Sequence, residues 1–214
     1  MSTGEIGQIA GVVLAGGLSR RMGGGDKALL ALGADTMLDR VIARVRPGIM
    51  HMVINANGDP GRFARFGVPV VADTVEGFVG PLAGVLAGLR WAASVSPQLT
   101  HVLSVSSDAP FLPADLARRL GEALMAGDAP IAMARSAGHL HPVIGLWPVA
   151  LADDLEQALR QGVRKVLAWT DRHGTVAVDF PLLRVGGVEV DPFFNANTPE
   201  ELDEARQLLQ DMTS

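Results

Sequence analysis

Short apolar runs alternate with helical patterns along most of this chain, and that alternation limits the folds open to it. Four runs have the length and composition of strands, at residues 9–15, 50–54, 68–72 and 101–105. Continuous apolar runs are typical of strands buried on both faces of a parallel sheet. The alternation predicts an α/β fold with three layers, in which helices cover both faces of a mostly parallel sheet.

Helix signals separate these runs. Thr36 is a good N-cap for a helix that stops at Pro47, and Gly80-Pro81 precedes a helix over residues 82–94. Thr198, followed by a proline and two glutamates, predicts the start of a last helix. Further helices are expected at residues 113–125, 149–161 and 164–170, and further strands at 130–134, 142–147 and 176–180.

Composition limits the number of domains, the kinds of site and the partners that this chain can have. The 214 residues are 48% apolar and contain no linker-like stretch, which favours one domain over residues 1–214. The absence of cysteine excludes disulfides and thiolate zinc sites. A net charge of −5 gives no general attraction to nucleic acid or to an anionic membrane. The chain has no signal-like start, and its longest apolar stretch, residues 81–95, is too short to span a bilayer, so we expect a cytoplasmic protein.

Polar residues follow the predicted strands at the points where each one ends. They are the loop at residues 16–27, Asn55, Asp73 and Asp108. In open α/β sheets, ligands bind beyond the carboxyl ends of the strands. These four positions are therefore expected on one edge of the sheet.

The loop after the first strand has the composition of a phosphate cradle. Residues 11–27 read GVVLAGGLSRRMGGGDK. Glycines let backbone N–H groups approach an anion, and Arg20, Arg21 and Lys27 supply positive charge. Lys27 is one of only two lysines in the chain. The loop is neither a P-loop, since Ala28 stands where a hydroxyl is needed, nor a Rossmann fingerprint, since its glycines at 23 and 25 lie too far past the strand.

Asp108, directly after an apolar strand, is placed to hold Mg²⁺ beside such a loop. An isolated Asp-x-Pro is more often a turn cap, and the glycine loop reverses that preference. Asn55 and Asp73 could contact a base or ribose, or could form Asx turns. Asn195 and Asn197 could add metal or phosphate contacts, although their segment is also a good helix start.

The opening motif resembles the signature of the molybdenum cofactor guanylyltransferases, the MobA family: Leu14-Ala15-Gly16-Gly17, then Arg21-Met22-Gly23, then Asp26-Lys27. Further motifs follow in the family's order: Asn55-Ala56-Asn57, Ala72-Asp73, Gly80-Pro81-Leu82-Ala83-Gly84, Asp108-Ala109-Pro110, His141-Pro142 and Asn195-Ala196-Asn197-Thr198-Pro199-Glu200-Glu201. The opening motif is typical of nucleotidyltransferases in general, and the ordered set is specific for this family.

The resemblance implies a Rossmann-like nucleotidyltransferase fold that transfers GMP from GTP to Mo-molybdopterin and releases pyrophosphate. The product is molybdopterin guanine dinucleotide. Carried over by position, the implied site consists of Leu14, Ala15, Gly16 and Gly17 on the nucleotide, Arg21 and Lys27 on the triphosphate, Asn55 and Asp73 on the nucleoside, and Asp108 on Mg²⁺. The N-terminal half would bind the nucleotide.

The C-terminal half would face the pterin substrate, with Arg135, His139 and His141 as candidate contacts. The resemblance also implies transient contact with molybdoenzyme chaperones. Neither nucleic acid nor a membrane is expected as a partner.

Other functions stay open at this point. A cytidylyltransferase acting on the same pterin tends to read Leu-Ala-Ala-Gly, so Gly16 favours guanine by leaving room for a purine. Sugar-phosphate nucleotidyltransferases share the glycine-rich opening but often carry additional domains. A non-catalytic nucleotide sensor would not need Lys27 and Asp108.

Overall fold

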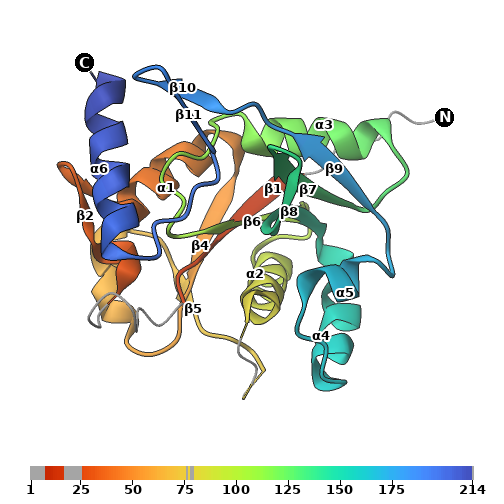
Figure 1. Cartoon of the computed structure of the whole chain (residues 1–214). Helices are drawn as coiled ribbons and strands as arrows, with labels where there is room; N and C mark the ends of the chain where they lie inside the picture. The colour runs from red at the N-terminus through yellow and green to blue at the C-terminus, as the bar shows by residue number, and fades with distance from the viewer. Residues whose placement is uncertain (1–7, 17–25, 76, 78–79, 214) are drawn as a thin grey trace.

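In the computed structural model of this chain, residues 8–16, 26–75, 77 and 80–213 are described. Their centre is a seven-stranded sheet with the order β5-β4-β1-β6-β8-β7-β9 (Figure 1). The strands are β1 (Gln8–Leu14), β4 (His51–Asn55), β5 (Val70–Val71), β6 (Leu99–Ser106), β7 (Ile131–Ser136), β8 (His139–Pro148) and β9 (Thr175–Asp179). All neighbouring pairs are parallel except the two that involve β8. The predicted mostly parallel α/β sheet is confirmed.

Helices cover both faces of this sheet. On one face lie α1 (Met37–Val45) and α3 (Leu116–Ala126), and on the other lie α2 (Pro81–Val95), α4 (Ala152–Arg160) and α5 (Val166–Thr170) (Figure 1). Side chains of one strand point alternately to the two faces. Val13 accordingly packs in the core with α1 and α3, and Val12 in the core with α2 and α4. Both valines are fully buried.

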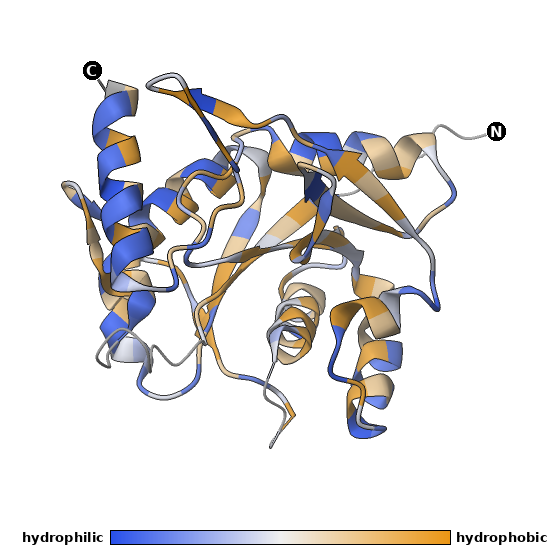
Figure 2. Cartoon of the chain, viewed as in Figure 1, coloured by the Kyte–Doolittle hydropathy of each residue, from blue (hydrophilic) through white to orange (hydrophobic). Residues whose placement is uncertain are grey.

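A third core lies beside the first two, around α6 (Pro199–Thr213). It joins segments from both ends of the chain: Leu32 in β2 (Ala31–Leu32), and Val185 and Val190 in the hairpin of β10 (Leu183–Val185) and β11 (Val188–Val190). A second short hairpin pairs β2 with β3 (Asp35–Thr36). Figure 2 shows α6 striped with hydrophobic and hydrophilic residues, as expected for a helix with one buried face.

Most predicted helices form where capping residues indicated. Thr36 caps α1 with a reciprocal capping box, in which its side chain accepts from the Asp39 N–H and Asp39 accepts from the Thr36 N–H. The single helix expected at residues 149–161 is wrong in one respect, since Val149–Leu151 forms a 3-10 turn (η5) before α4. Likewise α3 begins at Leu116, because the preceding turn uses the Pro113 carbonyl to accept the Leu116 N–H.

Two glycines bring α2 against the end of β1. A Cβ at Gly88 would lie 2.8 Å from Val12 Cβ, and a Cβ at Gly84 would overlap the side-chain oxygen of Asn55. Such contacts admit only glycine without a shift of the neighbours. The first turns of α2 therefore lie directly against the carboxyl end of the sheet, where Asn55 stands.

Candidate active site

The candidate site lies where the order of the strands reverses. The chain passes from β1 to β4 and β5 on one side and then crosses back to β6 on the other. Leu14, the last residue of β1, is in register with Asn55 of β4 and Ser106 of β6. The strand ends therefore lie side by side on one edge, as predicted. A reversal point of this kind is the usual ligand-binding crevice of open α/β sheets.

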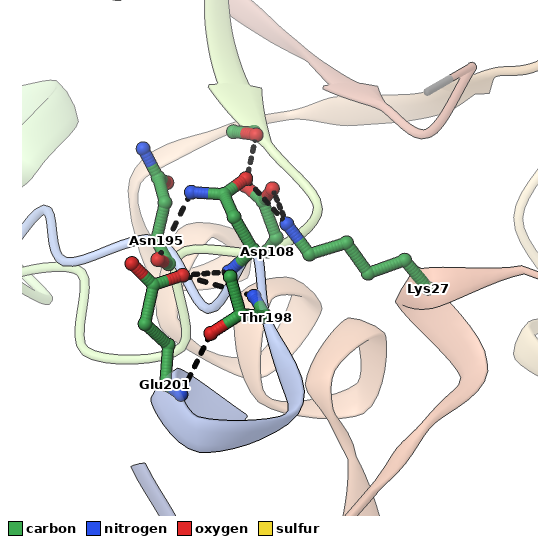
Figure 3. A network of polar contacts seen from close by, with 7 residues as sticks. Lys27, Asp108, Asn195, Thr198 and Glu201 are labelled. Carbon is green, nitrogen blue, oxygen red and sulfur yellow. Dashed lines mark hydrogen bonds and ion pairs between the residues drawn. The ribbon is translucent and has the colours of Figure 1, made fainter. Parts of the chain in front are cut away.

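Lys27 and Asp108 meet at this crevice. Lys27 opens a short 3-10 helix, η2 (Lys27–Leu29), and Asp108 follows β6. The Lys27 Nζ lies 2.5 Å from Asp108 Oδ2 and 2.7 Å from Asn197 Oδ1, so that one ammonium stands between two oxygens (Figure 3). The Ser106 hydroxyl donates to the other oxygen of the Asp108 carboxylate. Both ion-pair side chains are largely buried, at 13% and 16% exposure.

The cap of α6 brings Asn197 to Lys27. Glu201 accepts from the backbone N–H groups of Asn197 and Thr198, at 2.5 and 3.0 Å, and the Glu201 N–H donates to the Thr198 hydroxyl at 3.2 Å (Figure 3). This is a capping box, and it confirms Thr198 as the N-cap residue. The Ala196 N–H donates to the Asp108 carbonyl at 3.2 Å. The segment before α6 is thus attached directly to the turn that carries Asp108.

Asn55 and Asp73 form a second group on the same edge. The Asn55 Nδ2 donates to Asp73 Oδ1 at 3.0 Å, and the Asn57 Nδ2 donates to Asp73 Oδ2 at 2.8 Å. The Asp73 N–H returns a hydrogen bond to Asn57 Oδ1 at 2.9 Å. Asn55 is buried. The two amides hold the carboxylate in one orientation, which preorganises polar groups at the ends of β4 and β5.

Gly16 leaves space beside Asn55. Among the described residues, an added Cβ at Gly16 would meet only Asn55 Oδ1, at 4.0 Å, which is an ordinary contact. Gly16 is also absent from the residues with positive φ. Neither packing against the described residues nor backbone conformation therefore requires glycine here.

The other predicted nucleotide contacts divide into two sets. Leu14 and Ala15 lie at the crevice, but the Leu14 carbonyl accepts from the Ser107 N–H and the Ala15 N–H donates to the Asn55 carbonyl. The Leu14 carbonyl and the Ala15 N–H are therefore already hydrogen-bonded to the neighbouring segments of the sheet. Gly17 and Arg21 lie outside the described residues, as do Arg20 and the glycines at 23 and 25.

The candidate pterin contacts lie on the same edge, farther along the sheet. Arg135 near the end of β7 forms a two-pronged ion pair with Asp179 of β9, at 2.6 and 2.5 Å, and these hydrogen bonds raise the pKa of the Arg135 guanidinium. His141 contacts Ser136 at 2.6 Å, and the Ser136 hydroxyl donates to Asp191 at 2.7 Å. Burial lowers the pKa of His141. His139 is exposed.

The donor set at Lys27 fits a hard divalent cation of the Mg²⁺ type. Mg²⁺ prefers oxygen ligands and is commonly held by one or two carboxylates together with substrate phosphates. Asp108 and Asn197 direct two oxygens at one point, and that point now holds the Lys27 ammonium. The described part of the chain contains no group of three or more acidic or histidine residues suited to a metal. A cation at this point would therefore also need oxygens from a bound substrate, such as phosphate oxygens.

Three residues at this edge, Ser106, Asn57 and Glu201, are not among the predicted site residues. Ser106 and Asn57 each stand two residues from a predicted site residue, Asp108 and Asn55 respectively. Side chains two apart can share one turn, and that spacing was the available signal. For Glu201, the sequence indicated only a place in the first turn of the last helix.

No helix among the described residues combines the length and the apolar character needed to cross a bilayer.

The sequence of this chain is similar to those of known proteins. Residues 11–185 match the sequence model of the MobA-like NTP transferase domain. The chain is 51% identical over 209 residues to the molybdenum cofactor guanylyltransferase of Bradyrhizobium sp. (strain ORS 278), which covers 97% of this chain and 96% of that relative.

Two solved structures share the fold. Molybdopterin-guanine dinucleotide biosynthesis protein A from Archaeoglobus fulgidus has a TM-score of 0.72 at 24% identity, covering 94% of this chain and 98% of that chain. Rv0371c from Mycobacterium tuberculosis, solved in complex with manganese, has a TM-score of 0.64 at 19% identity, with the same coverage of 94% and 98%. Both likenesses confirm the three-layer α/β architecture.

Proposed function

This chain belongs to the MobA-like NTP transferase family and is a nucleotidyltransferase, and on that premise we propose that it is a molybdenum cofactor guanylyltransferase. The reaction joins the GMP moiety of GTP to the terminal phosphate of Mo-molybdopterin and releases pyrophosphate. The observation that carries the proposal is the convergence of Lys27, Asp108 and Asn197 at the strand reversal point.

The chemistry is a displacement at phosphorus. An oxygen of the pterin phosphate forms a bond to the α-phosphorus of GTP, and the bond from that phosphorus to the bridging oxygen of the β-phosphate breaks. The attacking oxygen is already ionised near neutral pH, so no strong general base is required. The protein must bring two anions together and stabilise the charge that develops.

Lys27 is suited to this task because its ammonium is held by neighbours that a ligand can replace. In the structure it pairs with Asp108. When a triphosphate enters, we expect Lys27 to turn from Asp108 to the phosphate oxygens, together with Arg21 from the glycine-rich loop. Asp108 and Asn197 would then hold Mg²⁺, which supplies positive charge at the phosphates when bound.

The nucleoside would lie over the end of β1. Gly16 provides room there, and Asn55 with Asp73 provides fixed polar groups. The space left by a missing methyl group favours a purine over the smaller pyrimidine. The pterin would lie along the edge formed by β7 and β8, near Arg135, His139 and His141.

Calorimetric titration with GTP, CTP and ATP, each with and without Mg²⁺, tests the proposal. Selective GTP binding that Mg²⁺ strengthens is expected, followed by pyrophosphate release when Mo-molybdopterin is added. Preference for CTP would move the chain to the cytidylyl branch. Failure to bind any nucleotide, with or without the pterin, would refute a transferase role for this site.

A further inference from the structure

Arg62 connects the two halves of the nucleotide side of this site. It lies in the 3-10 helix η4 (Pro60–Phe66), between β4 and β5. Its Nη2 donates to the Asn57 carbonyl at 2.6 Å, and its Nε lies 2.9 Å from Asp26 Oδ2. Asp26 directly precedes Lys27, and Asn57 holds Asp73. One guanidinium therefore spans the phosphate side and the nucleoside side.

Asp26 does not make the capping hydrogen bond that its position predicts. It stands at the N-cap of η2, where an aspartate side chain ordinarily accepts a backbone N–H of the helix it precedes. Its side chain makes no such capping bond. The carboxylate instead faces Arg62, with side-chain exposures of 21% for Asp26 and 29% for Arg62. The Asp26 carboxylate therefore pairs with Arg62 and does not cap η2.

The contact between these two side chains is electrostatic in character. The Arg62 Nε is buried and makes no aligned hydrogen bond among the described residues, although the carboxylate lies at ion-pair distance. The guanidinium also packs over the Phe63 ring, 4.9 Å from its centre, and Phe63 is fully buried. Stacking fixes the plane of the guanidinium, so its fork can hold two partners at once.

We propose that Arg62 is a positioning residue for the transfer reaction. It fixes the backbone entering Lys27 relative to Asp73 and Asn55, so that triphosphate and nucleoside are received in one geometry. The inference rests on the proposed function. The chain of contacts has consecutive links at 2.9 Å from Asp26 to Arg62, 2.6 Å from Arg62 to Asn57, and 2.8 Å from Asn57 to Asp73.

Arg65 provides a matched control on the same short helix. It also pairs with an aspartate, Asp39 at 2.5 Å, and also packs over a phenylalanine, Phe66 at 4.3 Å. Its partners are the cap of α1, however, and not the site. Loss of an ion pair and of ring packing is therefore common to both substitutions, and loss of the connection between the two site groups is particular to Arg62.

The first readout needs no nucleotide. The Leu29 and Leu30 N–H groups donate to the Asp26 and Lys27 carbonyls at 3.0 and 3.1 Å. In the free protein, Arg62→Ala should speed hydrogen exchange at these amides by about tenfold, because local opening there is no longer opposed by Arg62. Arg65→Ala should leave them unchanged. Equal exchange in the two variants would overturn the proposal even if the chain binds no nucleotide.

The second readout is the dependence of turnover on GTP. Arg62→Ala should raise KM for GTP and lower kcat, together by about tenfold to a hundredfold in kcat/KM, because misplacement of about 1 Å has effects of that size. Arg62→Lys should lie between, since one ammonium cannot hold both partners, and it replaces the alanine variant if that one does not fold. The double variant Arg62→Ala with Asp26→Ala should be no worse than the worse single variant.

These outcomes separate two kinds of failure. If wild-type protein prefers CTP or binds nothing, the proposed function fails, and hydrogen exchange still decides whether Arg62 fixes the residues around Lys27. If wild-type protein turns over GTP but Arg62→Ala matches Arg65→Ala in kcat/KM, the positioning role is wrong. Additive effects of Arg62 and Asp26 would also contradict it.

Discussion

Lys27 and Asp108 lie 81 positions apart in the sequence, yet the Lys27 Nζ stands 2.5 Å from Asp108 Oδ2 at the point where the strand order reverses. Each residue compensates the charge of the other. Their opposite charges therefore cancel at the centre of the candidate site. On the proposed function, a triphosphate with its cation would enter by exchanging partners, without a new charge being exposed.

We predict that Lys27→Ala and Asp108→Asn each lower turnover by about a hundredfold or more, because each removes charge stabilisation at the transferring phosphate. Asp115→Asn is the control, since Asp115 also pairs with a basic side chain, Arg118, but stands at the N-cap of α3 with its side chain 44% exposed. Steady-state rates of pyrophosphate release measure the effect, and circular dichroism checks the fold. Folded variants with wild-type rates would refute these assignments.

Gly16→Ala should weaken GTP binding by about tenfold or more, since one methyl group in a closely fitting pocket has effects of that order. The fold should be preserved, because the nearest described atom to the added Cβ is 4.0 Å away. Nucleotide titration and thermal unfolding distinguish these effects. Unchanged GTP affinity would mean that the nucleoside lies elsewhere.

Glu201→Gln should lower both stability and turnover. The substitution weakens the acceptor for the Asn197 and Thr198 N–H groups, and loss of a cap costs about 1 kcal/mol. Because the same bonds place Asn197 against Lys27, kcat should fall more than the stability change explains. Glu200→Gln, at the adjacent position in the same turn, is the control. An equal loss of kcat in both variants would argue against a role for this cap in the site.

Asp154 should give stability that depends on pH. The Trp169 indole donates to Asp154 Oδ1 at 2.6 Å, and this bond, with that of His173, lowers the pKa of Asp154. The unfolded chain therefore takes up the proton first as pH falls. The stabilisation is full above the ordinary pKa of 3.8 and is lost as pH falls through the lower folded value.

Asp154→Asn should accordingly lower the free energy of unfolding by only about 0.5 kcal/mol at pH 7, because the Asp154 side chain is 47% exposed and solvent screens its charge, and the difference from wild type should shrink near pH 3. Denaturant titration at both pH values measures it. Asp153→Asn is the control, because its carboxylate is 89% exposed and its pair with Arg90 should contribute little. A difference for Asp154→Asn that does not change with pH would contradict the assignment.

Local sequence signals predicted the parts of the fold that depend on neighbours in the chain. The apolar run before Asn55 ends where β4 ends, and Thr36 and Thr198 cap helices through residues three positions away. The same signals predicted that Asn55, Asp73 and Asp108 share an edge. That inference needed only the common direction of the strands.

Other features depend on contacts that no local pattern contains. The direction of β8 is set by the two-residue turn at Ala137 and Gly138, both with positive φ, which reverses the chain after β7. The hairpins β2–β3 and β10–β11 are two or three residues per strand, too short for a periodic signal. Asn197 reaches Lys27 across 170 positions, and only the docking of α6 brings them together.

The third core has a consequence for how the protein is made. It joins Leu32 near the start of the chain to Val190 and Leu208 near its end, and the segment between those last two carries Asn197. During synthesis the N-terminal part of the chain emerges first, and a domain folds as a unit. The segments that bear Lys27, Asn55 and Asp108 are therefore synthesised before Asn197, whose amide oxygen contacts Lys27. The candidate site can therefore be complete only after the last helix has been made and has packed against the first hairpin.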